Sequence, residues 1–379
     1  EDLEIWTRCE VPQVGDIVFS YETRIGQVAV ISEGLSCNNG RRMALMRVNP
    51  AKAVPDYLLY AYLSPGFQDV IRQSTIHGST VDRIPLVEFR SFPISVPPLD
   101  VQKNVVATLR ALDDRIVLLR EAKITLEAVA QTLYKSWFVD FDPVRAKMEG
   151  RPPEDMDEAI ACLFPDNLEE AELGLMPSGW NFAAIRDMVE GVYDGPHATP
   201  PEADCGPVFL GIKNLTGTAL DLSEIRHIAE AQWEQWTRRV EPRAGDIVFS
   251  YEATLGYFAL IPPGLRCCLG RRLALIRPKA RDGATHFWFH QFTAAPFKRM
   301  LEKHTIQGAT VNRIALKEFP SYAVLNPPLM LQLAFDKLVA PLWAKIHENQ
   351  TQAQTLTELR DTLLPRLISG QLRINVLAD

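Results

Sequence analysis

The segment from Leu99 to Phe138 reads LDVQKNVVATLRALDDRIVLLREAKITLEAVAQTLYKSWF and is predicted to form one long helix. Apolar or tolerated side chains return along it at alternating steps of three and four, and charged side chains fill most other positions. With a rise of ~1.5 Å per residue, this helix is a rod of roughly 60 Å, which a single small domain does not need. Its seam consists of Leu109, Leu112, Ile116, Leu119, Lys123, Leu126, Ala130, Leu133 and Trp137.

A second seam in the same register lies 230 residues further along the chain. Alone, the first helix would suit the core of a bundle, but a matching copy favours an antiparallel, pseudo-two-fold coiled coil within the chain. That orientation would carry the domain before each helix to opposite ends of the pair. Pro341 replaces Ala111 of the first copy, so a kink or a fresh start is expected there. The second seam consists of Val339, Leu342, Ile346, Leu356 and Leu363.

Length and composition fit a globular protein of two or three domains. The chain has 379 residues, of which 47% are hydrophobic. No apolar run approaches the ~18 residues that cross a bilayer, and no signal-peptide pattern opens the chain, so a cytoplasmic location without a membrane partner is expected. Six cysteines show no zinc-type spacing, which predicts neither a metal site nor a disulfide. We expect all six to be small buried apolar side chains.

The net charge of −7 argues at first against a nucleic-acid partner. About 11 acidic residues against about 3 basic ones fall between Asp140 and Leu175, however, so this connector holds the acidity and the rest is nearly neutral. No broad basic face is encoded. Any contact with DNA is therefore expected to be local or assisted by another protein.

An internal duplication organises the remaining sequence. About 24 of the 42 residues from Trp6 to Arg47 are identical to those 230 positions later, without a gap. The second copy has about 55 earlier residues, from near Pro177, that have no counterpart before Glu1, so the first domain is expected to lack its N-terminal part. The expected order is a first domain at 1–98, a long helix at 99–142, an acidic connector at 143–176, a second domain at 177–326 and a second long helix at 327–379.

Each copy predicts a small curved sheet followed by helices. Glycine-bounded strands are expected near 17–22, 28–31 and 41–45, and again near 247–252, 258–261 and 271–275. Aromatic-rich helices are expected at 56–64 and 285–293, with further helices at 67–72 and 297–302. The connector is expected to hold one short helical piece, around 157–163, and Pro143 is expected to end the first long helix.

One loop keeps glycine, threonine and arginine in both copies. It runs TIHGSTVDRI at 75–84 and TIQGATVNRI at 305–314. Close backbone approach at glycine, a hydroxyl group and a guanidinium group suit a phosphate or a base edge. An equally weighted alternative is a tight turn in which threonine caps and arginine pairs with Glu88 or Glu318. The candidate DNA contacts are Thr80, Arg83, Thr310 and Arg313.

The second domain adds a proline-stiffened loop, YDGPHATP at 193–200, and then GIKNL at 211–215. His197 and Thr199 suit base recognition, and Lys213 and Asn214 are candidate donors nearby. An ordinary stiff surface loop is the somewhat favoured alternative.

Motifs for catalysis are absent from the sequence. It has no Gly-x-x-x-x-Gly-Lys-Ser/Thr, no Gly-x-Gly-x-x-Gly after a strand and no His-Glu-x-x-His. His77 becomes Gln307 in the copy, which does not suit a general base. The chain is therefore predicted not to be an enzyme and to hold no cofactor or metal of its own.

Four motifs together resemble the specificity subunit of type I DNA restriction-modification enzymes. They are PSGW at 177–180, LYKSWFVDFDP at 133–143, PPL at 97–99 and 327–329 with Gln102 and Gln332, and LPRLISG at 364–370. The resemblance spans nearly the whole chain. It implies an α+β fold with two similar target-recognition domains, each a small curved β-sheet plus helices, joined by two long helices in an antiparallel coiled coil.

The resemblance also implies function and partners. Each recognition domain would read one half of a bipartite site in double-stranded DNA. Two modification subunits would supply methyltransferase chemistry with S-adenosylmethionine, and restriction subunits would supply translocation and cleavage with ATP and magnesium. Further candidate DNA contacts are Tyr21, Arg41, Arg42, Tyr251, Arg271 and Arg272, with the arginines on phosphates or guanine edges and the tyrosines stacking or hydrogen-bonding.

Because the two copies are so alike, related half-sites in inverted orientation are expected. Two alternatives stay open. One is the detached specificity component of a fused restriction enzyme, or an orphan subunit that serves methylation only. The other is a scaffold whose paired domains bind protein or sugar.

Overall fold

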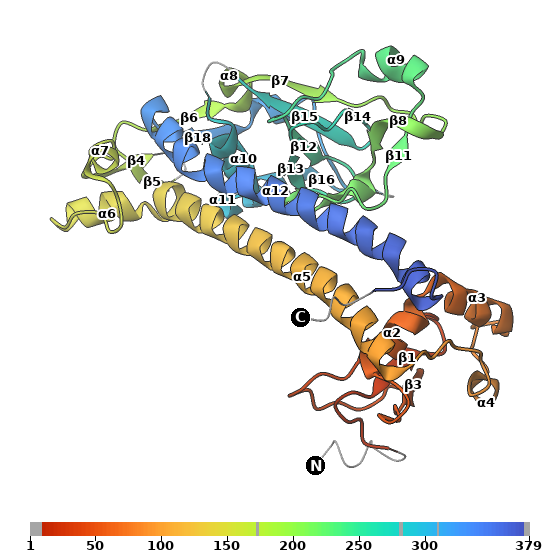
Figure 1. Ribbon diagram of the computed structural model, residues 1–379. Helices are drawn as coiled ribbons and strands as arrows, with labels where there is room; N and C mark the ends of the chain where they lie inside the picture. The colour runs from red at the N-terminus through yellow and green to blue at the C-terminus, as the bar shows by residue number, and fades with distance from the viewer. Residues whose placement is uncertain (1–9, 172–173, 280–282, 309–310, 375–379) are drawn as a thin grey trace. The chain divides into compact units, whose positions relative to one another are not determined.

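The computed structural model describes residues 10–171, 174–279, 283–308 and 311–374, which divide into two compact units. Unit 1 comprises Glu1–Ala122 and Asn349–Asp379, and unit 2 comprises Lys123–Glu348. Two long helices, α5 (Leu99–Lys135) and α12 (Leu329–Ile368), contribute residues to both units (Figure 1). Mixed strands and helices with two long helices confirm the predicted α+β class.

Unit 1 holds a three-stranded antiparallel sheet in the order β2-β1-β3. The helices α2 and α3 each begin with a proline in the first turn, where its missing N–H is not needed. Phe19 of β1 packs among Tyr62, Phe67 and Ile71 from these helices. The elements are β1 (Ile17–Ser20), β2 (Val28–Val30), β3 (Met43–Met46), α2 (Pro55–Leu63), α3 (Pro65–Ser74) and α4 (Leu86–Phe89).

Unit 2 repeats this arrangement and extends it. Its main sheet has the order β13-β12-β15-β7, so β7 adds a fourth antiparallel strand beside β15. The repeated elements are β12 (Ile247–Ser250), β13 (Phe258–Leu260), β15 (Leu273–Pro278), α10 (Thr285–Thr293), α11 (Ala295–Lys303), β16 (Thr305–Ile306), β17 (Arg313–Ile314) and β18 (Ala323–Asn326). The strands and helices predicted from the duplication are confirmed in both units.

The added elements of unit 2 lie between the connector and β12, except β14, which lies between β13 and β15. Strand β6 pairs with β18, and β8 pairs with β11 and β14. They are β6 (Asn181–Ala184), α8 (Ile185–Met188), β7 (Val189–Asp194), β8 (Ala203–Leu210), β9 (Leu215–Thr216), β10 (Ala219–Leu220), β11 (Arg226–His227), α9 (Trp233–Thr237) and β14 (Cys267–Leu269).

The connector is more structured than predicted. Helix α5 ends in a π-helical turn, Ser136–Asp140, and Phe141 then takes a left-handed conformation with φ 58°. Pro143 does not end the long helix, because it lies in the first turn of the next one, α6 (Asp142–Met148). α7 (Glu158–Ala161) and a hairpin of β4 (Leu168–Ala171) and β5 (Gly174–Pro177) follow.

Apolar anchors explain this order. Val144, Phe164 and Met176 from the connector are buried in the main core of unit 2, although acidic residues dominate the surrounding sequence. Their burial supplies the favourable free energy that an acidic, solvated linker would lack.

The two long helices pack against each other in antiparallel orientation inside each unit. In unit 1 the start of α5 meets the end of α12, where Leu109 packs with Leu364 and Ile368. In unit 2 the end of α5 meets the start of α12, and the rings of Tyr134 and Phe335 lie 5.5 Å apart. Every predicted seam residue is buried or half-buried. The predicted antiparallel pair is therefore confirmed.

Two irregular positions in the seam are accommodated locally. Lys123 pairs with Glu127 one turn later at 3.8 Å, which places a charge pair where the seam lacks an apolar residue. The fresh start predicted at Pro341 does not occur, because α12 continues through it. Only the helical bond to the carbonyl of Lys337 is lost, and both residues are exposed to water.

The cysteines divide into buried and exposed groups. Cys267 and Cys268 are fully buried in β14, and burial raises the pKa of each thiol to about 12. Cys162 and Cys205 are exposed and Cys37 is half-buried, so the expectation that all six are buried is wrong. Both exposed cysteines lie in segments without a counterpart in unit 1. Cys9 lies outside the described residues.

Candidate nucleic-acid interface

The centre of the candidate surface in each unit is a tight turn that carries two arginines, Arg41 and Arg42 in unit 1 and Arg271 and Arg272 in unit 2. We call residues 40–42 and 270–272 the arginine turns. Each is closed by a backbone bond to the glycine carbonyl, from Met43 at 3.0 Å and from Leu273 at 3.1 Å. Each is also joined to the end of the central strand through the carbonyl of its second arginine. The duplicated sequence thus builds the same turn twice.

The tyrosine after the central strand supports this turn from below. The hydroxyl group of Tyr21 donates to the carbonyl of Arg41, and that of Tyr251 to the carbonyl of Arg271, at 2.9 Å in both units. Tyr251 is only 4% exposed, and burial raises the pKa of its hydroxyl group to about 12. The predicted stacking of Tyr251 on a base does not fit its burial. Its place assigns it to holding the turn.

The loops at 75–84 and 305–314, here the Gly-Thr-Arg loops, are attached to the same place. Backbone bonds join Ile76 and Arg83 in both directions at 2.9 and 3.0 Å, and Ile84 donates to the carbonyl of Tyr21 at 2.8 Å. In unit 2 Ile314 donates to the carbonyl of Tyr251, also at 2.8 Å. The loop arginine and the arginine turn therefore belong to one surface in each unit.

The glycine of this loop serves the loop itself. A Cβ atom on Gly78 would lie 2.5 Å from the carbonyl oxygen of Val81, and one on Gly308 would lie 2.1 Å from that of Val311. The tight-turn alternative thus accounts for the glycine. The other half of that alternative fails, because Arg83 and Arg313 make no ion pair with a glutamate among the residues the structure describes. Both guanidinium groups are exposed.

The threonine of the Gly-Thr-Arg loop lies within the described residues in unit 1 only. Thr80 is exposed and caps no helix within the described part of the chain. Thr310 lies outside the described residues. The DNA-contacting role of both threonines stays a prediction.

The second arginine of each turn has an acidic neighbour. Arg42 donates to the hydroxyl group of Thr23 at 2.9 Å and lies 3.6 Å from Glu22. Arg272 lies 3.9 Å from Glu252. Arg41 and Arg271, by contrast, are exposed and make no side-chain bond to any described residue. The first arginine of each turn is therefore the freer cation for a phosphate or a guanine edge.

Unit 2 adds the proline-stiffened loop to this surface. Gly195 donates its N–H to the carbonyl of Leu273 at 3.1 Å, beside the arginine turn, and a Cβ atom there would lie 2.7 Å from the carbonyl of Gly270. Asp194 holds Nε2 of His197 at 2.8 Å and Nη1 of Arg239 at 2.5 Å. His197 and Thr199 are both exposed on this loop, as predicted sites require.

Two further candidates, Asn214 and Lys213, differ in their exposure and hydrogen bonds. Asn214 is 3% exposed, and its amide accepts from Gly211 and donates to the carbonyls of Asp221 and Glu224, at 2.9, 3.0 and 3.0 Å. It has no donor left for DNA, so its place contradicts the prediction and gives it a structural role. Lys213 is exposed, with Nζ 3.4 Å from Glu224, and stays a candidate.

Sequence reasoning missed two arginines. Arg24 lies exposed at the tip of the β1–β2 hairpin and lines a surface hollow with Arg42 and Thr23. Arg239 is exposed beside Asp194 and donates to the carbonyl of Gly195 at 3.3 Å. Neither is repeated, because Thr254 and Cys9 take the matching positions. A search based on duplication therefore could not find them.

The arrangement suits binding rather than bond chemistry. Exposed guanidinium groups on turns fixed by backbone bonds can position phosphates and read guanine. Within the described ranges, no group of three or more His, Cys, Asp or Glu side chains could hold a metal ion. Over the same residues, no helix combines the length and apolar character needed to cross a membrane.

Comparison with known proteins gives one consistent answer. Residues 7–128 match the family model described as the type I restriction modification DNA specificity domain. Over 96% of its length the chain is 23% identical to the type I restriction enzyme MjaIX specificity subunit of Methanocaldococcus jannaschii, covering 79% of that protein. It is 21% identical to the HindI specificity subunit of Haemophilus influenzae, covering 96% of this chain and 91% of that protein.

The chain is similar along nearly its whole length to type I restriction enzyme specificity subunits.

A solved structure supports the fold. The S subunit of the type I restriction-modification system from M. genitalium matches 95% of this chain and 84% of its own, with a TM-score of 0.55 at 15% identity. The family model covers the first arginine turn, its tyrosine and the first Gly-Thr-Arg loop. The matched region therefore contains this surface as it is built in unit 1.

Proposed function

We propose that this chain is a specificity subunit, that it binds double-stranded DNA in a sequence-specific manner and that each unit reads one half of a bipartite target. One observation carries the proposal. The same exposed surface, made of an arginine turn, a supporting tyrosine and a Gly-Thr-Arg loop, is built twice in a chain whose residues 7–128 match a DNA specificity domain.

The arginines supply the chemistry of recognition. Arg41, Arg83, Arg271 and Arg313 have no side-chain partner among the described residues and can each present two parallel N–H donors to guanine or to a phosphate. Rigid placement matters because an immobilised donor loses less conformational entropy when it binds. His197, Thr199 and Arg239 extend this surface in unit 2 only. The two half-sites are therefore read by overlapping but unequal sets of side chains.

The chemistry of modification and cleavage is assigned to other subunits. We propose that two modification subunits bring S-adenosylmethionine and methyl transfer, and that restriction subunits bring ATP, magnesium, translocation and cleavage. In unit 2, exposed apolar side chains on the long helices offer a place for such partners to pack. Met330 is 63% exposed, Ile124 65% and Val129 50%.

The proposal is tested with the purified chain and its modification subunits on a library of DNA duplexes. Retarded mobility that depends on two separated half-sites, with methylation at those sites, is the expected result. Methylation at a single continuous motif would contradict the bipartite reading. No retardation in either the presence or the absence of modification subunits would favour the scaffold alternative.

A further inference from the structure

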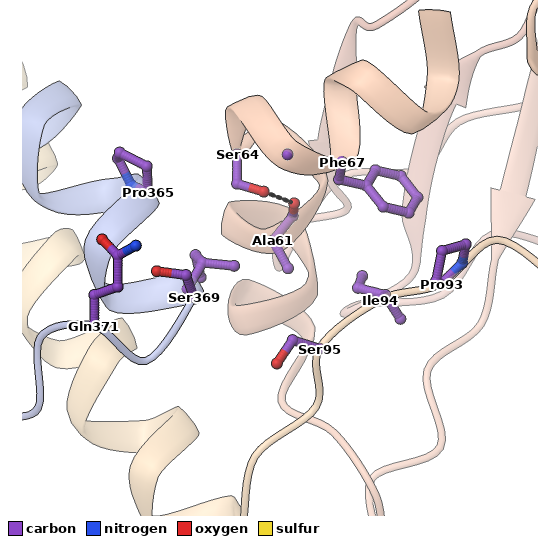
Figure 2. Close-up of a pocket in the computed structure, with 11 residues that line it drawn as sticks. Ala61, Ser64, Phe67, Pro93, Ile94, Ser95, Pro365, Ser369 and Gln371 are labelled. Carbon is purple, nitrogen blue, oxygen red and sulfur yellow. Dashed lines mark hydrogen bonds between the residues drawn. The ribbon is translucent and has the colours of Figure 1, made fainter. Parts of the chain in front are cut away.

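Charged groups and free hydrogen-bond donors come together around Arg239 in unit 2. The cavity of about 360 Å³ in unit 1 offers no such chemistry, because none of the described residues that line it carries a charge (Figure 2). We propose, as an extension that rests on the proposed function, that Arg239 reads a guanine in the half-site of unit 2. In this arrangement Asp194 is a positioning residue, which holds the guanidinium group of Arg239 in the orientation that reading requires.

Asp194 lies beside the arginine turn of unit 2. It is the last residue of β7, opposite Ala274 of β15, and the next residue, Gly195, donates its N–H to the carbonyl of Leu273 at 3.1 Å. A Cβ atom on Gly195 would lie 2.7 Å from the carbonyl oxygen of Gly270, so any side chain there would push the two segments apart. Backbone contacts therefore fix the position of Asp194 relative to the arginine turn.

Both carboxylate oxygens of Asp194 are engaged. Oδ1 lies 2.5 Å from Nη1 of Arg239, and Oδ2 lies 2.8 Å from Nε2 of His197. The Asp194 side chain is 29% exposed, against 47% for Arg239 and 59% for His197, so the carboxylate is the least exposed group of the three. A carboxylate that faced DNA directly would repel its phosphates. The pairing of Asp194 therefore assigns it to orienting its neighbours.

The guanidinium group of Arg239 is held through one nitrogen only. Nη1 lies beside Asp194 and donates to the carbonyl of Gly195 at 3.3 Å. Nε and Nη2 make no hydrogen bond to any residue that the structure describes. The group is thus fixed at one corner while the opposite edge stays available to a ligand.

The free edge of Arg239 carries two parallel N–H donors. Arg277 uses the same edge toward Asp246, with Nε and Nη2 at 2.8 and 2.7 Å from the two carboxylate oxygens. In a guanine, O6 and N7 form the corresponding pair of acceptors in the major groove. The available edge of Arg239 therefore has the donor pattern that selects guanine.

The hydroxyl group of Tyr251 connects Arg239 to the arginine turn. Burial raises the pKa of Tyr251 to about 12, with smaller upward effects from Glu252 and Asp194 and a downward effect from Arg239. Asp194 and Arg239 thus lie within electrostatic range of this hydroxyl group, which donates to the carbonyl of Arg271. Arg239 and Arg271 therefore belong to one surface and to the reading of one half-site.

A phosphate contact is the alternative use of Arg239. Binding to phosphates depends on net positive charge and carries no direct sequence information. The carboxylate of Asp194 lowers the net positive charge of the cluster, which weakens attraction to phosphates, but it fixes the direction of the guanidinium group. That exchange favours base reading over phosphate binding.

The test uses the chain with its modification subunits on duplexes of the motif that the wild-type complex methylates. Each guanine of the motif is replaced in turn by 7-deazaguanine, which lacks the N7 acceptor. We expect one replacement to weaken binding by the wild type roughly tenfold and to have no effect on binding by Arg239→Ala. If every replacement has the same effect on both proteins, the proposal is wrong.

Two conservative variants separate positioning from a structural role. Asp194→Asn keeps the shape of the side chain and removes its charge. We expect it to lower the preference for that guanine roughly fivefold and to strengthen binding to unrelated DNA, because the surface gains positive charge. Arg239→Lys keeps the charge without the paired donors, so it is expected to lose the preference and keep non-specific binding. Loss of both kinds of binding in both variants would overturn the proposal.

Arg266→Ala is the matched control. Arg266 forms a two-bond ion pair with Glu230, at 2.8 and 2.6 Å, and directly precedes β14, whereas the arginine turn follows the other end of that strand. We expect its guanine preference to equal that of the wild type. An equal loss of preference in Arg266→Ala and Arg239→Ala would overturn the assignment of Arg239.

Salt dependence and the wild type complete the test. A phosphate contact by Arg239 would make Arg239→Ala weaken binding to all sequences alike and reduce the slope of log affinity against log salt by about 1, which would overturn base reading. A wild-type complex that binds no duplex would overturn the proposed function itself. Sequence-specific binding by the wild type with an unaltered guanine preference in Arg239→Ala would overturn this inference alone.

Discussion

The hydroxyl groups of Tyr21 and Tyr251 illustrate how one atom shapes the recognition surface. Each donates to the carbonyl of the first arginine in an arginine turn, at the same distance in both units. Residue type alone suggested stacking or hydrogen bonding at a DNA contact, because an aromatic side chain near arginines is common at nucleic-acid interfaces. Its direction, however, depends on the packing of the strand below it. That part of the site could not be predicted from the sequence.

Replacing Tyr251 with phenylalanine is expected to weaken DNA binding roughly fivefold, because a loss of about 1 kcal/mol accompanies the lost hydrogen bond. The ring stays buried, so the fold is kept. Tyr57→Phe is a matched control, since it removes a similar bond to the carbonyl of Ser95 away from the arginine turn. Fluorescence anisotropy with target DNA checks both. Equal weakening by the two variants would contradict a positioning role for Tyr251.

Asn214 is a residue that the sequence suggested for DNA binding and that the structure places in a structural role. Its neighbour Lys213 is exposed to solvent, whereas the amide side chain of Asn214 makes hydrogen bonds to three backbone groups. Two adjacent polar residues look alike in a sequence, and only the turn that they build separates them. The exposed arginines were predictable because duplication marked Arg41, Arg83, Arg271 and Arg313.

At the scale of elements, the starts of the two long helices look alike in the sequence but differ in their hydrogen bonds. Gln102 is fully buried near the start of α5, where Oε1 accepts from Val54 and Nε2 donates to Pro97 and Lys52, at 2.9, 2.7 and 3.1 Å. Among the described residues, Gln332 of α12 donates to the carbonyl of Pro327 and to the side chain of Asn326. The sequence marked both positions, but it did not show which groups each glutamine side chain binds.

Gln102→Ala is expected to lower the free energy of unfolding by about 2 kcal/mol, because it leaves the buried N–H of Val54 without a partner. Gln332→Ala leaves no described backbone N–H unpaired and is expected to lower it less. Urea denaturation of both variants, followed by circular dichroism, makes the comparison. A larger loss for Gln332→Ala would contradict this account.

Helix α10 contacts α12 through a buried histidine. Burial, with a smaller effect from His286, lowers the pKa of His290 to about 3, and its Nε2 accepts from Trp343 at 3.2 Å. An unfolded histidine titrates near pH 6.5. Between these values the unfolded chain binds more protons, so stability falls as the pH drops, by at most about 1.4 kcal/mol per unit.

Thermal unfolding between pH 7 and 4 checks this dependence. His290→Gln is expected to flatten the curve while keeping an acceptor for Trp343. Part of the slope remains, because burial also lowers the pKa of His347. Tyr60→Phe alters the matching position of unit 1, which does not titrate here, and is expected to leave the slope unchanged. An unaltered slope in His290→Gln would refute the assignment.

The connector marks the limit of prediction for elements. Strands and helices of the repeat followed from glycine spacing and apolar period, because each pattern occurred twice. Helix α6 and the β4–β5 hairpin did not, since acidic residues outnumber the few that anchor them, Val144, Phe164 and Met176. Local composition predicted a solvated linker, whereas distant packing decided the outcome.

At the scale of the whole molecule, two like surfaces on one chain predict separable defects. Arg83→Ala is expected to relax recognition at one half-site and Arg313→Ala at the other, each by about 1–3 kcal/mol of discrimination. Sequencing of DNA methylated by the reconstituted complex reads both half-sites in one experiment. Arg72→Ala, on the exposed face of α3, is the control. If either variant relaxed both half-sites equally, independent reading would be wrong.

The antiparallel helix pair was predictable because the same register appears 230 residues apart. That the helices set the spacing of the half-sites stays a prediction, as do the inverted, related half-sites.

The tips of the two hairpins carry a wider implication. Thr23 and Ala253 both take the left-handed conformation, with φ 67° and 64°, although neither is glycine. Main-chain bonds hold these tips, through the bridge between Glu22 and Arg83 and through the bond from Ala253 to Asn312. Since these main-chain bonds hold the backbone of each tip, its side chains can be replaced by mutation while the backbone conformation is kept. Single substitutions at these tips can therefore change which DNA sequence such a protein recognises without disturbing its fold. The difference between Arg24 and Thr254 is an example of such a change.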